Sequence, residues 1–295
     1  GRVWGRSGFY QAGGAFGFRD QLQDMLSLMY LEPDMVRAHL LLAAGHQFES
    51  GDVQHWWHPE RQGVRTHISD DLLFLPYVTA RYVKETGDLT ILEEEANYLK
   101  DVEIPEGQED WYGIPELSEQ REGLYGHCMR ALRRAGSRLG SHGLPLMGTG
   151  DWNDGMNRVG NKGKGESVWL AEFLAVTARE FSELARESDK EELFQMADAL
   201  CEAIETHCWD GDWYIRAFND EGEKLGSASS QGGCRIDALS QSWAVMAGLN
   251  PDRVRRAMDQ VYLQLVDERV GIVKLLTPPF DGEGTDPGYI RGYLP

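Results

Sequence analysis

Helical periodicity interrupted by glycine-rich loops is the sequence feature that most constrains this chain. Apolar residues recur at spacings of three and four over 19–31 and again over 35–43, after Pro33, which suits the first turn of a helix. The same spacing predicts further helices at 69–86, 89–99, 118–139, 167–188, 190–207, 236–247 and 251–265. Pro76 falls inside a predicted helix, so we expect a kink or a restart there. Loops are expected at 101–117 and 143–161, and short strands at 212–218 and 271–276.

These elements predict an all-α fold with minor short β-strands. Helix pairs joined by long functional loops favour a toroid of antiparallel helices, an (α/α) barrel whose site lies at one rim. An open bundle is the alternative, because periodicity alone does not separate the two. No repeat of fixed period is present, which argues against a solenoid. With 295 residues, 41% of them hydrophobic, the chain can bury one large core or two smaller ones, and we expect one catalytic domain over 1–295.

The net charge of -19 restricts the partners of the chain. Nucleic acid and anionic lipid headgroups would be repelled, whereas a neutral ligand such as a sugar is compatible with this charge. No run of about 18 apolar residues occurs, so we expect no membrane contact by this segment. The four cysteines are scattered without a CxxC pair and are typical of reduced thiols in a cytoplasmic protein, with a Cys201–Cys208 disulfide as the alternative.

The stretch 144–157 is the richest in chemistry. Asp151 and Asp154 flank Trp152, and glycines on both sides let the backbone turn tightly and approach a ligand. A glycosyl-transfer site needs one carboxylic acid that protonates the departing glycosidic oxygen, and an indole can cover the apolar face of a pyranose. The alternative is an Asx-turn or a calcium-like loop, although the spacing does not match an EF-hand.

A second stretch, 13–24, runs from a glycine-rich loop into a helix whose first turn carries Arg19 and Asp20. Asp20 can cap that helix, or it can accept hydrogen bonds from sugar hydroxyls at the rim of the fold. The glycine pattern does not precede a predicted strand, so a dinucleotide-binding fold is not supported.

A third stretch, 54–58, combines Gln54 and His55 with two tryptophans and a second histidine. We interpret it as a sugar-binding loop, with Asp70 or Ser69 capping the helix that follows. A zinc site at the two histidines is the alternative, but neither an HExxH motif nor a cysteine accompanies them.

A fourth stretch places Asp237 and Gln241 one turn apart at the start of the predicted helix 236–247. The two side chains can face the site. They are equally compatible with a capped helix that has one polar face.

Together these stretches resemble glycoside hydrolase family 94, the inverting phosphorylases of β-linked glucosides. The matching motifs occur in the order of the family at 9–11, 18–24, 54–58, 143–145, 151–154 and 286–289, so the resemblance covers essentially the whole chain. Within the family, the chain resembles the C-terminal phosphorylase-like domain of cyclic β-1,2-glucan synthases and β-1,2-oligoglucan phosphorylases.

The resemblance implies a six-hairpin (α/α)6 barrel with Asp154 as the general acid. Trp152 and Asp20 would line the subsite of the transferred glucosyl unit, and Arg6 would lie near that unit and the phosphate. Inorganic phosphate would be the co-substrate, with no cofactor and no metal, and a β-linked oligosaccharide would yield α-glucose 1-phosphate. A phosphate dianion is itself a nucleophile, so one essential carboxylate is enough, whereas an inverting hydrolase needs a second as base.

The pattern and the resemblance together give a set of expected site residues. Asp154 is the catalytic residue, and the substrate-binding residues are Asp20, Arg19, Trp152, Asp151, Arg6, Gln54, His55, Asp237 and Gln241, of which Arg6 also contacts phosphate. Two alternatives stay open. One is an inverting (α/α)-barrel hydrolase with Asp71 or Glu166 as base, and the other is a non-catalytic carbohydrate-binding domain of a larger glucan synthase.

Departures from the family pattern qualify these expectations. Gly14 stands where cellobiose phosphorylases have a second arginine, which argues against cellobiose as the substrate. The phosphate-binding Glu-Asn-Gly-Gly run of the family would begin just after Pro295. The chain starts at Gly1 rather than Met and stops in turn-rich sequence, so we expect truncation at both ends. The resemblance to the family implies a homodimer and a covalent link to a larger membrane synthase.

Overall fold

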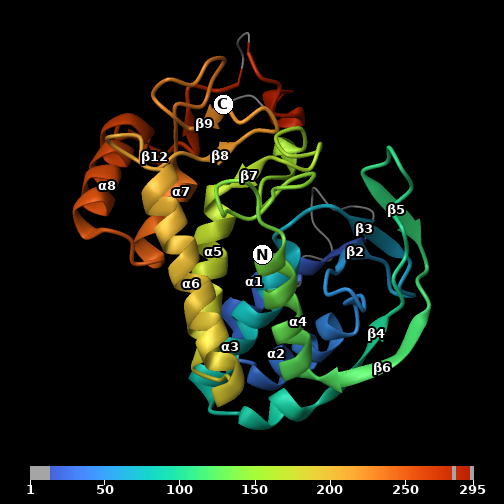
Figure 1. The fold of residues 1–295 in the computed structure, drawn as a ribbon. Coiled ribbons are helices and arrows are strands. Elements are labelled where there is room, and N and C mark those ends of the chain that lie inside the picture. The colour runs from blue at the N-terminus through green and yellow to red at the C-terminus, as the bar shows by residue number, and fades with distance from the viewer. Residues whose placement is uncertain (1–13, 281–283, 293–295) are drawn as a thin grey trace. The chain divides into compact units, whose positions relative to one another are not determined.

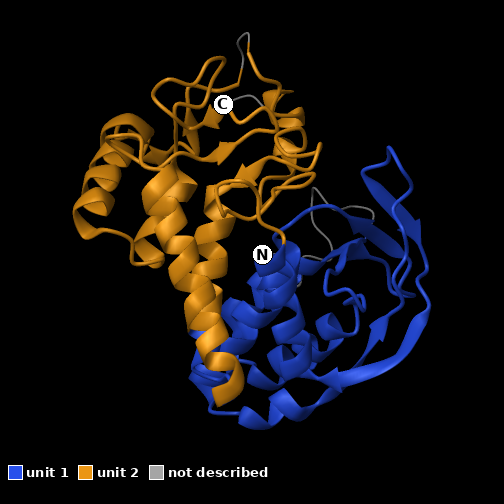
Figure 2. Cartoon of the chain, viewed as in Figure 1, with its two compact units in different colours: residues 1–137, 180–186 blue, residues 138–179, 187–295 orange. Residues whose placement is uncertain are grey.

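The computed structural model describes residues 14–280 and 284–292 (Figure 1). The chain divides into two compact units (Figure 2). Unit 1 comprises residues 1–137 and 180–186, and unit 2 comprises residues 138–179 and 187–295. None of the helices in the described ranges combines the length and apolar composition needed to cross a bilayer.

Unit 1 is built on a group of packed helices. These are α1 (Phe18–Leu28), α2 (Pro33–Ala44), α3 (Phe74–Thr86) and α4 (Leu124–Ser137). Pro33 occupies the first turn of α2, as the sequence predicts. The restart expected near Pro76 is confirmed, because the 3-10 turn η1 (Asp71–Leu73) passes directly into α3. Gly87 ends α3 in the left-handed region with a φ of 74°, a conformation that glycine adopts without a Cβ clash.

Unit 1 contains more β-structure than the sequence predicts. An antiparallel sheet takes the order β1-β2-β3-β5, and β4 pairs with β6. Their bounds are β1 (Phe16–Gly17), β2 (Gln54–Trp57), β3 (Gly63–Thr66), β4 (Glu95–Leu99), β5 (Asp110–Gly113) and β6 (Leu117–Gly123). The loop expected at 101–117 therefore contains β5.

Two helix predictions in unit 1 are wrong. The predicted helix 89–99 is the 3-10 turn η2 (Leu89–Glu93) followed by β4, and the first residues of the predicted helix 118–139 belong to β6. Antiparallel pairing joins these segments, with Glu95 opposite Gly123 and Leu99 opposite Leu117. Pairing with a distant segment overrides local helix propensity, because it satisfies the backbone groups of both strands.

Unit 2 contains four helices within the described residues. They are α5 (Val168–Ser182), whose last residues cluster with unit 1, α6 (Glu187–His207), α7 (Ala238–Met246) and α8 (Pro251–Leu265). Each corresponds to a predicted helix. Cys201 in α6 and Cys208 just after it are free thiols, as are Cys128 and Cys234, so the alternative of a disulfide is wrong.

Short strands tie the loops of unit 2 together. Three antiparallel groups form, β7-β8-β9, β10-β13 and β11-β12. Their bounds are β7 (Glu166–Ser167), β8 (Ala217–Phe218), β9 (Lys224–Leu225), β10 (Ile236–Asp237), β11 (Val266–Asp267), β12 (Ile272–Val273) and β13 (Leu276–Thr277). The fold is therefore rich in helices, with more strand structure than expected of an all-α chain.

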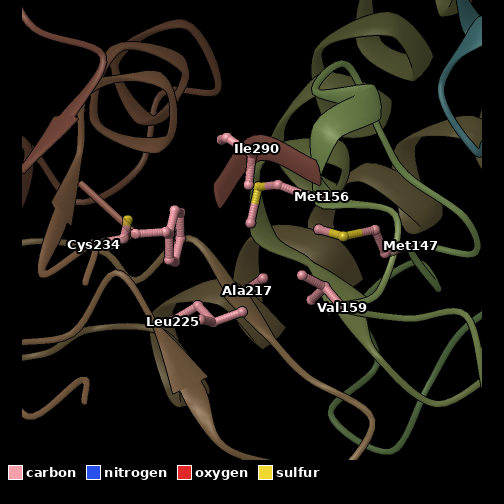
Figure 3. Close-up of a cluster of buried hydrophobic side chains, with 8 residues drawn as sticks. Met147, Met156, Val159, Ala217, Leu225, Cys234 and Ile290 are labelled. Atoms are coloured by element: carbon pink, nitrogen blue, oxygen red, sulfur yellow. The ribbon is translucent and has the colours of Figure 1, made fainter. Parts of the chain in front are cut away.

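A buried apolar cluster lies beneath the loops of unit 2 (Figure 3). Its members are Met147, Met156, Val159, Ala217, Leu225, Cys234, Phe280 and Ile290. They come from the glycine-rich stretch 143–161, from β8 and β9, from the loops next to β10 and β13, and from the last described turn, η4 (Tyr289–Gly292). The irregular stretch that carries Asp154 thus rests on a packed core.

Candidate active site

The loop that carries Asp154 is shaped by two consecutive Asx hydrogen bonds. The Asp151 Oδ1 atom accepts the Asn153 backbone N–H at 3.0 Å, and the Asn153 Oδ1 atom accepts the Gly155 N–H at 3.0 Å. The second bond caps the 3-10 turn η3 (Asp154–Met156). The Asx-turn alternative is therefore present, and it places Asp154 at the first position of a short helical turn.

The underside of this turn is fixed by packing. Figure 3 shows the Met156 side chain beside Ile290, within the buried cluster. A Cβ atom at Gly155 would lie 2.8 Å from the Ile290 Cβ, closer than side chains approach. Glycine is thus required where η3 meets η4, and close packing there leaves the acid-bearing turn little freedom.

Asp154 opens onto a cavity of about 770 Å³ within unit 2. Trp152, whose side chain is 37% exposed, lines the same cavity together with Asn153. Besides Gly155, the other lining residues come from the segment around β12 and β13 and from the last turn: Ile272, Lys274, Leu275, Leu276, Thr277, Pro279, Phe280, Tyr289 and Ile290. The volume lies within the range of small-molecule sites, and an accessible carboxyl beside an indole suits a sugar.

Asp151 lies underneath the loop rather than in the cavity lining. Its carboxylate is fully buried, and it accepts a 2.6 Å hydrogen bond from Arg216 Nη2 at Oδ1 and one of 2.6 Å from Ser167 Oγ at Oδ2. Burial opposes ionisation of this carboxyl, but the guanidinium and the hydroxyl outweigh it and hold the pKa of Asp151 below its usual range. Its predicted contact with substrate stays a prediction, and the contacts seen support the loop.

Asp237 and Gln241 are buried as well and brace α7. The Asp237 Oδ1 atom accepts the Leu239 N–H at 2.7 Å, which caps the helix. The Gln241 amide binds both backbone groups of Tyr214, at 2.9 Å to the N–H and 2.7 Å to the carbonyl oxygen. The structure thus shows the capped-helix interpretation, and substrate contacts of the two residues stay predictions.

Two of the unit 1 candidates, Arg19 and His55, make ionic contacts with buried aspartates. Arg19 Nη1 donates to Asp70 Oδ1 at 2.7 Å, and His55 Nδ1 lies 2.7 Å from Asp71 Oδ2. Asp20, half-buried, lies in the first turn of α1. Gln54 is fully buried and accepts a hydrogen bond from the His46 ring at 2.6 Å. Arg6 lies outside the described residues.

The two carboxylates considered as a hydrolytic base are both engaged in the fold. Asp71 is 2% exposed and binds His55. Glu166 is 1% exposed, accepts the backbone N–H groups of His142 and Leu144 at 3.0 and 3.3 Å, and binds the His142 ring at 2.5 Å. Neither carboxylate is available to water as a base should be.

Two buried charged residues, Arg216 and Glu172, were not predicted from the sequence. Arg216 is fully buried, and its Nε atom lies 3.6 Å from Asp237 Oδ2. Glu172 in α5 is also fully buried. A local signal existed for Arg216, since it is a lone charged residue in the apolar run 213–218. A charge in such a run indicates a buried ion pair, but its partner lies 65 residues away.

The family model for the glycosyl hydrolase 94 superfamily, catalytic domain, matches residues 1–295. The chain belongs to this superfamily. The resemblance seen in the motifs is thereby confirmed.

The chain is similar to a synthase and to phosphorylases. The cyclic β-(1,2)-glucan synthase NdvB of Rhizobium meliloti (strain 1021) is 47% identical over 300 residues, covering 100% of this chain and 11% of the synthase. The solabiose phosphorylase of Paenibacillus borealis is 34% identical, covering 95% of this chain and 34% of its own length. The N,N'-diacetylchitobiose phosphorylase of Vibrio furnissii is 30% identical, covering 98% and 37%. The chain thus spans about a tenth of the synthase and about a third of each phosphorylase.

Solved structures support the fold of this superfamily member. A rhamnosidase from Klebsiella oxytoca with rhamnose bound has a TM-score of 0.59 at 15% identity, over 86% of this chain and 42% of that chain. A GH78 family rhamnosidase of Bacillus sp. GL1 also has a TM-score of 0.59, at 14% identity, over 85% and 23%. The chain therefore has a six-hairpin glycosidase-like fold rich in helices.

Proposed function

We propose that this chain is the catalytic core of an inverting glycoside phosphorylase, a hexosyltransferase that cleaves β-linked gluco-oligosaccharides with inorganic phosphate. Its fold would be the (α/α)6 barrel, and Asp154 would be the general acid. The observation that carries the proposal is the accessible Asp154 carboxyl beside Trp152 in a sugar-sized cavity, on a superfamily 94 chain. The phosphorylases among the relatives support phosphate as the co-substrate.

We assign the proton transfer to Asp154, which lines the cavity beside Trp152. Its carboxyl gives a proton to the glycosidic oxygen as the bond between that oxygen and the anomeric carbon breaks. A phosphate oxygen forms the new bond to the anomeric carbon from the opposite face, so a β-glucoside yields α-glucose 1-phosphate and a shortened oligosaccharide with a free hydroxyl. Phosphate replaces the activated water of a hydrolase. The engagement of Asp71 and Glu166 in the fold supports a reaction without a carboxylate base.

The substrate side of the proposal follows the relatives. The 47% identity to a cyclic β-(1,2)-glucan synthase supports β-1,2-linked glucose as the substrate, and the share of that synthase covered supports a chain that is one part of a larger protein. A homodimer and a cytoplasmic location complete the proposal, the latter supported by four free thiols.

Phosphate release from α-glucose 1-phosphate tests the function in the synthetic direction. We expect the natural full-length protein to release phosphate with sophorose as acceptor, faster than with cellobiose. Asp154→Asn should lower the rate by about 100-fold or more, the usual contribution of a general acid. Asp212→Asn is a matched surface control, because Asp212 pairs with Arg256 at the exterior, and it should leave the rate unchanged. Hydrolysis to free glucose without phosphate release would instead show a hydrolase.

A further inference from the structure

The buried arginine of unit 2 is connected to the acid-bearing turn through an unbroken chain of hydrogen bonds. Arg216 donates to Asp151 Oδ1 at 2.6 Å, and the same oxygen accepts the Asn153 N–H at 3.0 Å. Asn153 then caps the turn that begins at Asp154. Each step is a direct contact within unit 2, and the last one sets the backbone direction at the acid.

Arg216 is itself held rigidly. Its backbone N–H donates to the Leu225 carbonyl oxygen at 2.7 Å, and its own carbonyl oxygen accepts the Val168 N–H at 3.2 Å. A Cβ atom on Gly226 would lie 2.6 Å from the Arg216 backbone nitrogen, so the chain is closely packed here. The Arg216 side chain therefore reaches Asp151 from a backbone that is hydrogen-bonded on both sides just before β8.

Ser167 provides a second anchor for the same carboxylate. Its hydroxyl donates to Asp151 Oδ2 at 2.6 Å and accepts the Leu170 N–H at 3.0 Å at the start of α5. Both carboxylate oxygens of Asp151 are thus hydrogen-bonded, Oδ1 to the Arg216 guanidinium and Oδ2 to the Ser167 hydroxyl just before α5. A carboxylate bound in this way has little rotational freedom. Because Asp151 Oδ1 also accepts the Asn153 N–H, the backbone at Trp152 and Asn153 is restricted as well.

The charge balance around Arg216 indicates more than a simple structural pair. Two buried carboxylates, those of Asp151 and Asp237, contact one guanidinium, and a third buried carboxyl group, that of Glu172, interacts with it electrostatically. Both Glu172 oxygens and the Arg216 Nε atom lack a hydrogen-bond partner among the described residues. A buried ion pair with unsatisfied neighbours is a poor source of stability, since hydrophobic residues of similar volume would often do better.

We propose that Arg216 is a positioning residue for the reaction, acting through Asp151 and Asn153 to hold the Asp154 carboxyl at the glycosidic oxygen. This inference rests on the proposed function, because it names a residue that orients the proposed acid. The reason is geometric. A displacement of about 1 Å in a catalytic group can lower a rate by roughly 100-fold, and Arg216 fixes the loop from which the acid projects.

Unit 1 offers a matched control for a buried arginine. Arg65 is 8% exposed and makes two hydrogen bonds to Asp52, at 2.8 and 2.6 Å. Its other side-chain hydrogen bonds go to Ser50, Asp101 and the Val102 carbonyl oxygen. Arg65→Gln should lower the melting temperature, but it touches no residue of the acid-bearing loop.

The test compares both variants in the natural full-length protein. With α-glucose 1-phosphate and sophorose, we expect Arg216→Gln to lower kcat by about 10- to 100-fold, with KM changed less than about 3-fold, and Arg216→Lys to restore part of kcat. Arg65→Gln should keep kcat within about 3-fold. Equal losses of kcat in Arg216→Gln and Arg65→Gln, or full kcat in Arg216→Gln, would overturn the proposal.

A second readout separates failure of this inference from failure of the proposed function. Amide hydrogen exchange over 150–156 should be at least about 10-fold faster in Arg216→Gln than in wild type, and unchanged in Arg65→Gln. Ser167→Ala, a milder change that keeps the arginine, should show a smaller acceleration. A wild-type protein without phosphorylase activity would refute the function, whereas unchanged exchange in Arg216→Gln would refute the positioning role whatever the activity.

Discussion

Two arginine–aspartate pairs, one in each unit, use the same chemistry in different surroundings. Arg65 and Asp52 in unit 1 retain side-chain exposures of 9% and 17%, whereas Arg216 and Asp151 in unit 2 are both at 0%. The Arg65 guanidinium is bonded at Nε and at both Nη atoms, but the Nε atom of Arg216 has no hydrogen-bond partner among the described residues. In the first pair every guanidinium nitrogen is hydrogen-bonded, whereas in the second two buried carboxylates contact a single guanidinium.

This difference indicates different roles: the unit 1 pair stabilises the fold, and the unit 2 pair supports the loop that carries the proposed acid. A satisfied pair near solvent contributes to stability in an ordinary way, since both charges keep their hydrogen bonds. In unit 2, the two buried carboxylates of Asp151 and Asp237 share the one guanidinium of Arg216, so more charge is removed from water than is paired. Asp151 also accepts the Asn153 N–H, so this imbalance lies next to the loop of Asp154. Local structure that is unfavourable for stability is commonly found where a side chain must be held for function.

The largest effect is expected from removing the carboxylate of each pair. Asp151→Ala should cost about 3 to 5 kcal/mol of unfolding free energy, because the fully buried Arg216 guanidinium loses its 2.6 Å hydrogen bond to Asp151 and keeps only longer contacts, such as the one of 3.6 Å to Asp237. Asp52→Ala should cost less, since Arg65 keeps hydrogen bonds to Ser50, Asp101 and the Val102 carbonyl oxygen. Urea melts of the two variants measure both values. Equal costs would remove the distinction between the pairs.

The acid response of unit 1 should come partly from His46. Burial lowers the pKa of His46 to about 4, although its hydrogen bond to Gln54 opposes this. The unfolded chain has an ordinary histidine, so the stability provided by the neutral ring is present above pH 6.5 and lost as pH falls toward 4, by about 3 kcal/mol in all. His46→Phe keeps a ring against Trp57 and should lose less stability between pH 7 and 4. Parallel pH profiles for wild type and variant would contradict this assignment.

Unit 2 should respond in the opposite direction at Asp237. Burial raises the pKa of Asp237 to about 6, with Arg216 opposing. Its contribution to stability is therefore present below pH 3.8 and lost as pH rises through about 6, again by roughly 1 to 3 kcal/mol. Asp237→Asn keeps a helix-capping side chain and should be more stable than wild type at pH 7 but not at pH 4.

Asp52 supplies the control for this comparison. Burial opposes its ionisation, but Arg65 outweighs burial and lowers the pKa of Asp52, so its contribution is present above pH 3.8 and lost below it. Asp52→Asn should thus lose stability at pH 7, where Asp237→Asn gains it. Denaturation of both variants at pH 4 and pH 7 gives the change in unfolding free energy relative to wild type. A change of the same sign in both variants would mean that the two carboxylates have equivalent surroundings.

Helix starts provide the smallest expected difference between the units. Asn250 caps α8 by accepting the N–H groups of Asp252 and Arg253, whereas Glu32 before α2 makes no side-chain cap. Asn250→Ala should cost about 1 kcal/mol and Glu32→Ala less than about 0.5 kcal/mol, as thermal melts can show. A larger cost for Glu32→Ala would point to contacts of that carboxylate beyond capping.

Sequence reasoning located the helices with apolar stripes and the loop of Asp154, because both signals are local. It failed at 89–99 and 118–123, where Glu, Ala, Leu and Arg favour a helix but antiparallel pairing between distant segments decides. It also could not connect Asp151 to Arg216. Such a pair depends on tertiary packing, and nothing at either position indicates which of the many opposite charges is the partner.

The most direct test of the central claim is the anomeric configuration of the first product. Proton NMR would follow the natural full-length protein acting on a β-1,2-linked gluco-oligosaccharide in phosphate buffer. The account predicts α-glucose 1-phosphate as the first sugar product, at a rate that Asp154→Asn reduces by about 100-fold or more. Free glucose formed without α-glucose 1-phosphate, or an undiminished rate in Asp154→Asn, would contradict it.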